Sequence, residues 1–218
     1  MQKRGWILLG VLLAQGLSAG EISGRVKVST SNAPPPVMLS PYSRNRYAPP
    51  GNLSAVSQPP VVVIYLKAHA GLGSAGGNYP VAVIDQKDLA ISPRVTIVQA
   101  GTAVDFTNSD AVYHNIFSLS RTKRFNLGRY PRGERRSVTF ENPGTVEIFC
   151  DIHSDMNAVV LVVPNTYYAI ADQDGSYSIK SVPPGTYTLT AWRENQAEQT
   201  RQVVITSGDD HIVLDFDL

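Results

Sequence analysis

The sequence predicts an all-β protein made of sandwiches or barrels. No stretch of its 218 residues holds the periodicity of an amphipathic helix. Short runs rich in β-branched residues recur instead, and Gly, Pro, Asn and Asp turns bound them at short intervals. Short strands that alternate with such turns are typical of antiparallel sandwiches and barrels.

Thirteen segments are expected to form strands. In chain order they are Ile22–Ser29, Val61–Leu66, Val81–Ile84, Val95–Gln99, Val104–Thr107, Ser137–Phe140, Val146–Phe149, Ala158–Val163, Tyr168–Ala171, Tyr177–Ile179, Tyr187–Trp192, Gln202–Thr206 and His211–Phe216. The dipeptide Asp174-Gly175 predicts a two-residue hairpin between Ala171 and Tyr177. Pro183-Pro184-Gly185 predicts a rigid turn before the next strand.

Two stretches interrupt this rhythm and are expected to be loops or linkers. Residues 30–60 contain eight prolines, and residues 68–79 are rich in glycine. Proline-rich chain favours an extended conformation and glycine-rich chain a flexible one.

Residues 1–20 have the pattern of a secretory signal peptide. Lys3 and Arg4 precede an apolar stretch from Trp6 to Leu13, and small residues follow, so cleavage is expected after Ala19 or Gly20. The alternative is an uncleaved N-terminal anchor. Since the apolar stretch is short for a membrane-spanning helix, we expect a periplasmic or secreted protein with no membrane span after cleavage.

The net charge argues against nucleic-acid and membrane-surface partners. Without Lys3 and Arg4 the chain carries 17 basic and 18 acidic residues, which gives a net charge of −1. One local exception is a run of seven cations within sixteen residues, interrupted by one acid, Glu134. These cations are Arg121, Lys123, Arg124, Arg129, Arg132, Arg135 and Arg136. The run is either a solvated surface or a docking patch for an acidic redox partner.

The single cysteine, Cys150, is the most informative residue for function. It cannot form an internal disulfide in an oxidising compartment, so it is a metal ligand, half of an intermolecular disulfide or a buried thiol. His153 and Met156 follow it at spacings of three residues, and His114 lies upstream. One Cys, two His and a weak Met are the ligand set of a blue-copper electron-transfer site.

Other metal sites fit these residues less well. Structural zinc prefers four Cys or His ligands and does not recruit a thioether, and a binuclear copper centre would need a second thiolate. Singly, His114 would be a half-buried histidine, Met156 core filler and Cys150 an inert thiol. His69 and His211 are expected at the surface. Two spare histidines are too few for a multicopper oxidase, so we expect no enzyme and no catalytic residues.

Residues 80–164 resemble a small cupredoxin of the plastocyanin and amicyanin type. The matching segments are residues 101–110, the run His114-Asn115-Ile116-Phe117-Ser118, residues 143–150, and His153 with Met156 in the short Cys-x-x-His-x-x-Met ligand loop. The resemblance implies a Greek-key sandwich that holds one type 1 copper ion through His114, Cys150, His153 and Met156. It also implies that Asn115 orients His114 and donates a backbone N–H toward the Cys150 sulfur.

The C-terminal segment resembles the transthyretin-like modules known as carboxypeptidase regulatory-like domains. The residues that carry this resemblance are 171–177, 182–189, 203–205 and 213–216. The first strands of such a module are missing just before Ala169 but present far upstream, in Ile22–Val26 and Val61–Leu66. We therefore expect a discontinuous sandwich of residues 21–67 and 166–218, with the cupredoxin part inserted, because the C-terminal strands alone would leave open edges. The alternative is a simple tandem order.

This pair of domains is also similar to a group of exported bacterial proteins described as methylamine-utilisation-like. Three functions follow as hypotheses. The first is an exported blue-copper protein that carries single electrons between redox partners. The others are a copper delivery or storage module, and a cell-surface interaction protein with a structural metal.

Overall fold

The computed structural model describes residues 19–28, 60–68, 79–208 and 210–218. Residues 1–18 of the expected signal peptide, most of both expected linkers and His69 lie outside these residues. The described chain is entirely β-structure, which confirms the predicted fold class. No helix that could span a bilayer occurs within it.

Within these described residues, seventeen strands form four sheets. Their bounds are β1 Gly20–Lys27, β2 Val62–Ala68, β3 Ala82–Lys87, β4 Ala90–Ser92, β5 Val95–Gln99, β6 Thr102–Asn108, β7 His114–Ser118, β8 Phe125–Tyr130, β9 Arg135–Phe140, β10 Gly144–Cys150, β11 Asn157–Val163, β12 Tyr168–Ile170, β13 Ser176–Val182, β14 Gly185–Arg193, β15 Gln199–Ile205, β16 His211–Val213 and β17 Phe216–Asp217.

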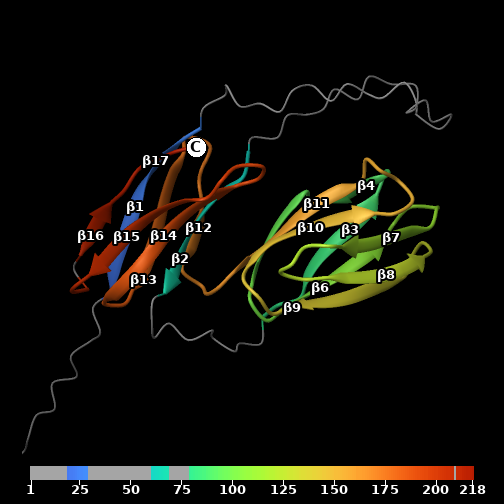
Figure 1. Ribbon diagram of the computed structural model, residues 1–218, viewed down its shortest axis with the longest axis horizontal. Coiled ribbons are helices and arrows are strands. Elements are labelled where there is room, and N and C mark those ends of the chain that lie inside the picture. Colours follow the sequence, from blue (N-terminus) through green and yellow to red (C-terminus); the bar gives the residue numbers. More distant parts are fainter. Residues whose placement is uncertain (1–18, 29–59, 69–78, 209) are drawn as a thin grey trace, which may run out of the picture.

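The sheets make two sandwiches that lie side by side (Figure 1). In the first, the sheet β5-β11-β10-β7-β8 faces the sheet β4-β3-β6-β9. In the second, the sheet β13-β1-β16, with β17 also paired to β1, faces the sheet β12-β2-β14-β15. The first sandwich spans residues 82–163. The second combines strands from both ends of the chain.

β1 and β2 each pair with strands from the C-terminal part of the chain. β1 pairs with β13 on one side and with β16 on the other, and β2 lies between β12 and β14. At Gly175 an added Cβ would lie 2.2 Å from the carbonyl oxygen of Val26. Its φ of +81° also favours glycine. This turn therefore lets β1 approach the C-terminal strands closely.

The two sandwiches share an apolar contact. It consists of Val63, Tyr65 and Trp192 from the second sandwich and Val159, Leu161 and Val163 from the first. Along β2 and along β11, every second residue faces the interior core of its own sandwich. The residues between them face the contact with the other sandwich, so both strands are buried on both faces. Burial on both faces explains why they are continuous apolar runs.

Several sequence predictions are wrong in detail. Asp174-Gly175 does form a turn, but its flanking strands do not pair as a hairpin, because β12 pairs with β2 and β13 with β1. The expected strand His211–Phe216 is two short strands, β16 and β17. Short strands also occur at Ala90–Ser92 and Phe125–Tyr130, where polar or charged residues obscure the pattern.

Candidate metal centre

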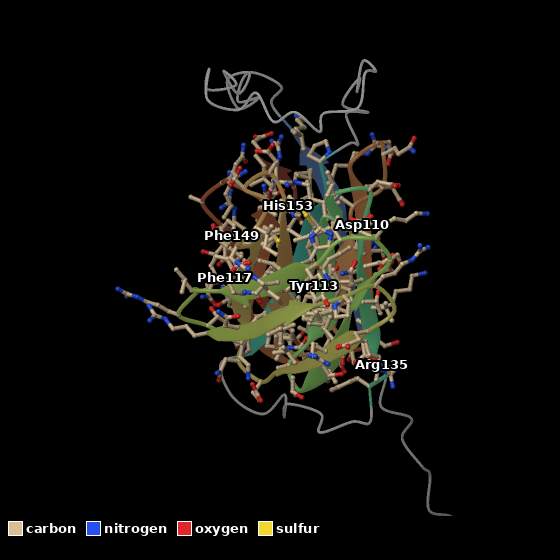
Figure 2. All side chains as sticks on the ribbon, turned by 90° about the vertical axis from the view of Figure 1, so that its right-hand side faces the viewer. Asp110, Tyr113, Phe117, Arg135, Phe149 and His153 are labelled. Atoms are coloured by element: carbon tan, nitrogen blue, oxygen red, sulfur yellow. The ribbon has the colours of Figure 1, made fainter. Side chains whose placement is uncertain are left out.

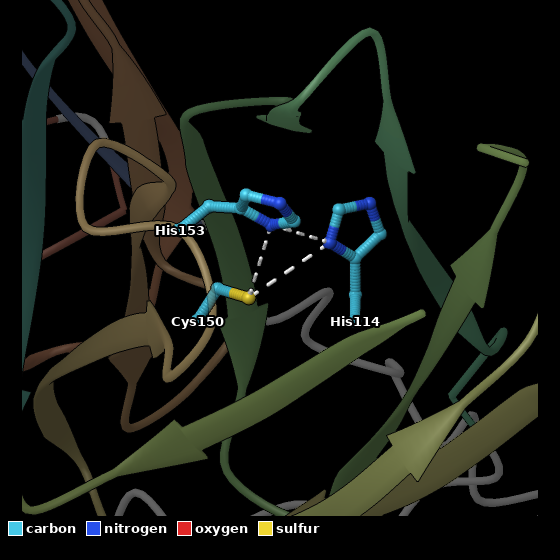
Figure 3. A group of neighbouring side chains, drawn as sticks. All are labelled: His114, Cys150 and His153. Atoms are coloured by element: carbon cyan, nitrogen blue, oxygen red, sulfur yellow. Dashed lines mark hydrogen bonds between the residues drawn. The ribbon is translucent and has the colours of Figure 1, made fainter. Parts of the chain in front are cut away.

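Three of the four predicted metal ligands converge at one end of the first sandwich (Figure 3). His114 begins β7, Cys150 ends β10, and His153 lies in the loop after β10. β7 and β10 are neighbours in one sheet, with Cys150 opposite Ile116. The antiparallel pairing therefore brings the start of one strand beside the end of the other, and the ligands with it.

The donor atoms form a small triangle. His114 Nδ1 and His153 Nδ1 lie 3.1 Å apart, and Cys150 Sγ lies 3.8 Å from the first and 4.0 Å from the second. A point equidistant from all three lies about 2.1 Å from each, close to the length of a metal–imidazole or metal–thiolate bond. The residues present therefore fit one metal ion that all three donor atoms would hold.

The loop that carries His153 is held by its own backbone. The N–H of Met156 donates to the carbonyl oxygen of His153 at 3.1 Å, and the N–H of Cys150 donates to the carbonyl oxygen of Met156 at 3.1 Å. Met156 is buried in the same core as Cys150, with 1% of its surface exposed. Its side chain thus packs in the core of the first sandwich, and its role as an axial ligand stays a prediction.

Burial differs among the three converging residues. His114 and Cys150 are buried, whereas His153 is half-buried. Burial, followed by the neighbouring His114, lowers the pKa of His153. A lowered pKa favours the neutral imidazole, which is the form that binds a metal.

Asp110 holds the far side of the His114 ring. Its Oδ2 lies 2.8 Å from His114 Nε2, so the ring donates its Nε2–H to the carboxylate and keeps the Nδ1 lone pair free. Burial raises the pKa of Asp110. Hydrogen bonds from His114 and from the backbones of Leu89 and Asp88 outweigh burial and hold that pKa below its ordinary value.

The sequence assigned the orientation of His114 to Asn115, and Asp110 was missed. Asn115 is buried, and its Oδ1 has no hydrogen-bond partner among the described residues. Its expected backbone contact with the Cys150 sulfur stays a prediction. The sequence shows Asp110 four residues before His114, but this spacing indicates a contact only if a loop brings the two side chains together.

The remaining predicted features lie outside the site. His211 is exposed, and its Nε2 lies 2.8 Å from Ser23 Oγ. Four of the seven cations in the basic run have acidic partners: Lys123 with Glu141, Arg129 with Asp151, Arg135 with Asp105 and Arg136 with Glu134. Arg121, Arg124 and Arg132 have no acidic partner within the described chain.

Comparison with protein families finds a match for the C-terminal part of the chain. Residues 156–218 match the model of the carboxypeptidase regulatory-like domain. The match begins at Met156, earlier than the predicted boundary at residue 166. A search of curated proteins finds no match.

Solved structures of copper proteins are similar to part of this chain. A purple cupredoxin from Nitrosopumilus maritimus is 29% identical and covers 37% of this chain and 98% of its own, with a TM-score of 0.34. A reduced amicyanin mutant is 20% identical over 45% of this chain and 97% of its own, with a TM-score of 0.37.

A third match is a copper-containing nitrite reductase from Thermus scotoductus. It is 22% identical, covers 43% of this chain and 24% of its own, and has a TM-score of 0.37. The family match agrees with the resemblance noted in the C-terminal segment of the sequence.

Proposed function

We propose that this protein is an exported type 1 copper protein that carries single electrons between redox partners and is not an enzyme. The observation that carries the proposal is the spacing of the three donor atoms. A thiolate and two imidazoles at 3.1, 3.8 and 4.0 Å from one another suit one copper ion.

The chain supplies the ligands in fixed positions. Cys150, His114 and His153 would form the trigonal plane, and Met156 would be the weak axial ligand. Bound copper would supply a centre that gains and loses one electron. Two strand ends and a loop closed by backbone hydrogen bonds hold the ligands, so little rearrangement is needed between oxidation states.

His153 is the proposed point of electron entry and exit, because it alone among the three converging ligands is partly exposed. Exposed apolar side chains adjoin the ligands in the sequence: Tyr113 is 56% exposed and Ile152 is 38% exposed. Exposed apolar surface beside a redox centre suits contact with a protein partner.

The partner is proposed to be a protein with an acidic surface. Arg121, Arg124 and Arg132 would attract it, since they have no acidic partner within the described residues. Arg135, at the other end of the basic run, lies well away from His153 (Figure 2) and is paired with Asp105. The attraction would therefore come from only part of the run.

The rival proposal is copper delivery or storage. The burial of His114 and Cys150 disfavours it, since a site that hands on its ion must be reached by a chelating partner. A one-electron titration separates the two. An electron carrier loses its colour with one equivalent of reductant and regains it with one equivalent of oxidant. It also keeps its copper in the presence of a chelator during this cycle. A delivery protein loses its copper to the chelator within the same period.

A further inference from the structure

The β3–β4 turn puts two non-glycine residues into the left-handed conformation beside the candidate metal centre. Asp88 and Leu89 have φ values of 56° and 57°. A two-residue turn of this kind favours Asn-Gly or Asp-Gly, and leucine adopts it at a cost in free energy. Such strain persists only where the surroundings enforce it, and it gathers at functional sites.

Packing does not account for the strain at Leu89. Its side chain is 40% exposed. What the conformation achieves is the direction of two backbone N–H groups. The N–H of Asp88 donates to Asp110 Oδ1 at 2.7 Å, and that of Leu89 donates to Asp110 Oδ2 at 3.0 Å.

The same carboxylate accepts the hydrogen bond from His114. Its Oδ2 is 2.8 Å from His114 Nε2 and 3.0 Å from the Leu89 nitrogen. The turn, the carboxylate and the ligand ring are thus joined in one chain of hydrogen bonds. Asp110 thus links the turn to the imidazole of His114. The other nitrogen of that ring, Nδ1, is one of the three donor atoms.

The backbone of Asp110 is held from the other side. Asn108 is buried, and its Oδ1 accepts from the Asp110 N–H at 2.9 Å. Its Nδ2 donates to the carbonyl oxygens of Val112 and Tyr130 at 2.9 and 3.0 Å. The N–H of Ser109 donates to the Gln86 carbonyl oxygen at 2.9 Å. The loop that leads to His114 is therefore held by hydrogen bonds that do not involve the metal ligands.

We propose that Asp110 is a positioning residue of the metal centre and that the strained turn at Asp88 and Leu89 holds its carboxylate in place. The carboxylate keeps the proton of His114 on Nε2 and so presents Nδ1 to the metal. This proposal goes beyond the ligand set and rests on the proposed function for its metal part only.

The first test needs no metal. Nitrogen NMR of the full chain without copper reports which ring nitrogen of His114 carries the proton. The wild type should show the Nε2–H form, and Asp110→Ala should show a mixture of the two forms. Asp85→Asn is the matched control, because Asp85 accepts from Thr107 and Ser109 in the same region without touching His114. An unchanged His114 signal in Asp110→Ala would overturn the proposal.

The second test separates the turn from the carboxylate. Leu89→Gly keeps the N–H and removes the strain, so the protein should become more stable while its copper affinity stays at the wild-type value. Asp110→Ala should lose about 10–100-fold in copper affinity, as changes at such partners do. It should also leave the Asp88 and Leu89 amides open to hydrogen exchange.

Each outcome bears on a different statement. Equal copper affinity in Asp110→Ala and the wild type would contradict the positioning role. No gain of stability in Leu89→Gly would contradict the strained turn. A wild-type protein that binds no copper would remove the proposed function alone, because the NMR result would still decide how His114 is held.

Discussion

Cys150 Sγ and His153 Nδ1 lie 4.0 Å apart across a loop of two intervening residues. The loop between them is closed by the hydrogen bonds through Met156, so the spacing is a property of the folded backbone. The third donor, His114, comes from a neighbouring strand that begins beside this loop. The geometry of the site therefore depends on the pairing of β7 with β10.

Replacing the thiolate should remove the colour of the protein. A thiolate bonded to Cu(II) gives an intense absorption in the orange-red region, so Cys150→Ser with added Cu(II) should lose this band altogether. Absorption spectroscopy checks the result, and His211→Ala serves as the control, because His211 is exposed and lies outside the site. A band that survives in Cys150→Ser would mean that another group binds the copper.

The ligands should differ in their contribution to copper affinity. His114→Ala removes a strong ligand of the plane, whereas Met156→Ala removes a weak axial one, so the first should lower affinity more than the second. Competition with a chelator measures both. Equal losses would show that the thioether is a stronger ligand than proposed, or that it acts through packing.

The contact between the sandwiches should contribute strongly to stability. Leu161 is fully buried in this contact, so Leu161→Ala should lower the free energy of unfolding by about 2–5 kcal/mol and leave the optical spectrum unchanged. Urea unfolding measures the change. Val204→Ala is the matched control on a strand, because Val204 is 53% exposed and its truncation should cost less than about 0.5 kcal/mol. A similar effect of the two substitutions would contradict a packed contact.

A turn before β16 should make stability depend on pH in the acid range. Asp210 accepts hydrogen bonds from the backbone N–H groups of Thr206 and Ser207 and from their hydroxyls, and these bonds lower its pKa from 3.8 to about 2. Because the folded pKa is the lower one, the contribution is present above pH 3.8 and disappears as the pH falls toward 2.

The variant Asp210→Ala tests this dependence. It should be less stable than the wild type at pH 7, and the difference should shrink as the pH falls from 3.8 to 2. Urea unfolding at several pH values follows the difference. If the difference in stability between the wild type and Asp210→Ala does not change with pH, the Asp210 carboxylate is not its cause.

The fold class and the ligands Cys150 and His153 could be predicted from local patterns, whereas the convergence of His114 depends on the pairing of β7 with β10. β-Branched runs between turns indicate strands, and Cys150 and His153 are close in the sequence. The continuous apolar runs of β2 and β11 also indicated that both strands are buried on both faces, and the strand prediction did not use this. A strand with one exposed face would show an alternating pattern instead. Both strands are buried between an interior core and the contact of the two sandwiches.

Several features that depend on distant pairing were not predicted in detail. Asp174-Gly175 looks like a hairpin signal, but β1 and β2, from the other end of the chain, compete for the flanking strands and separate them. β8 was missed because the exposed residues Asn126, Gly128 and Arg129 interrupt its apolar residues. Asp110 looked like an ordinary loop acid, because its partners at Asp88 and Leu89 lie more than twenty residues away.

X-ray absorption spectroscopy of the mature protein with one equivalent of copper examines the ligand set directly. We expect one short copper–sulfur bond and two imidazole nitrogens, assigned by loss of the sulfur in Cys150→Ser and of one nitrogen in His114→Ala. A copper ion surrounded only by nitrogen and oxygen, with the spectrum unaltered by both substitutions, would show that the three side chains do not share a metal.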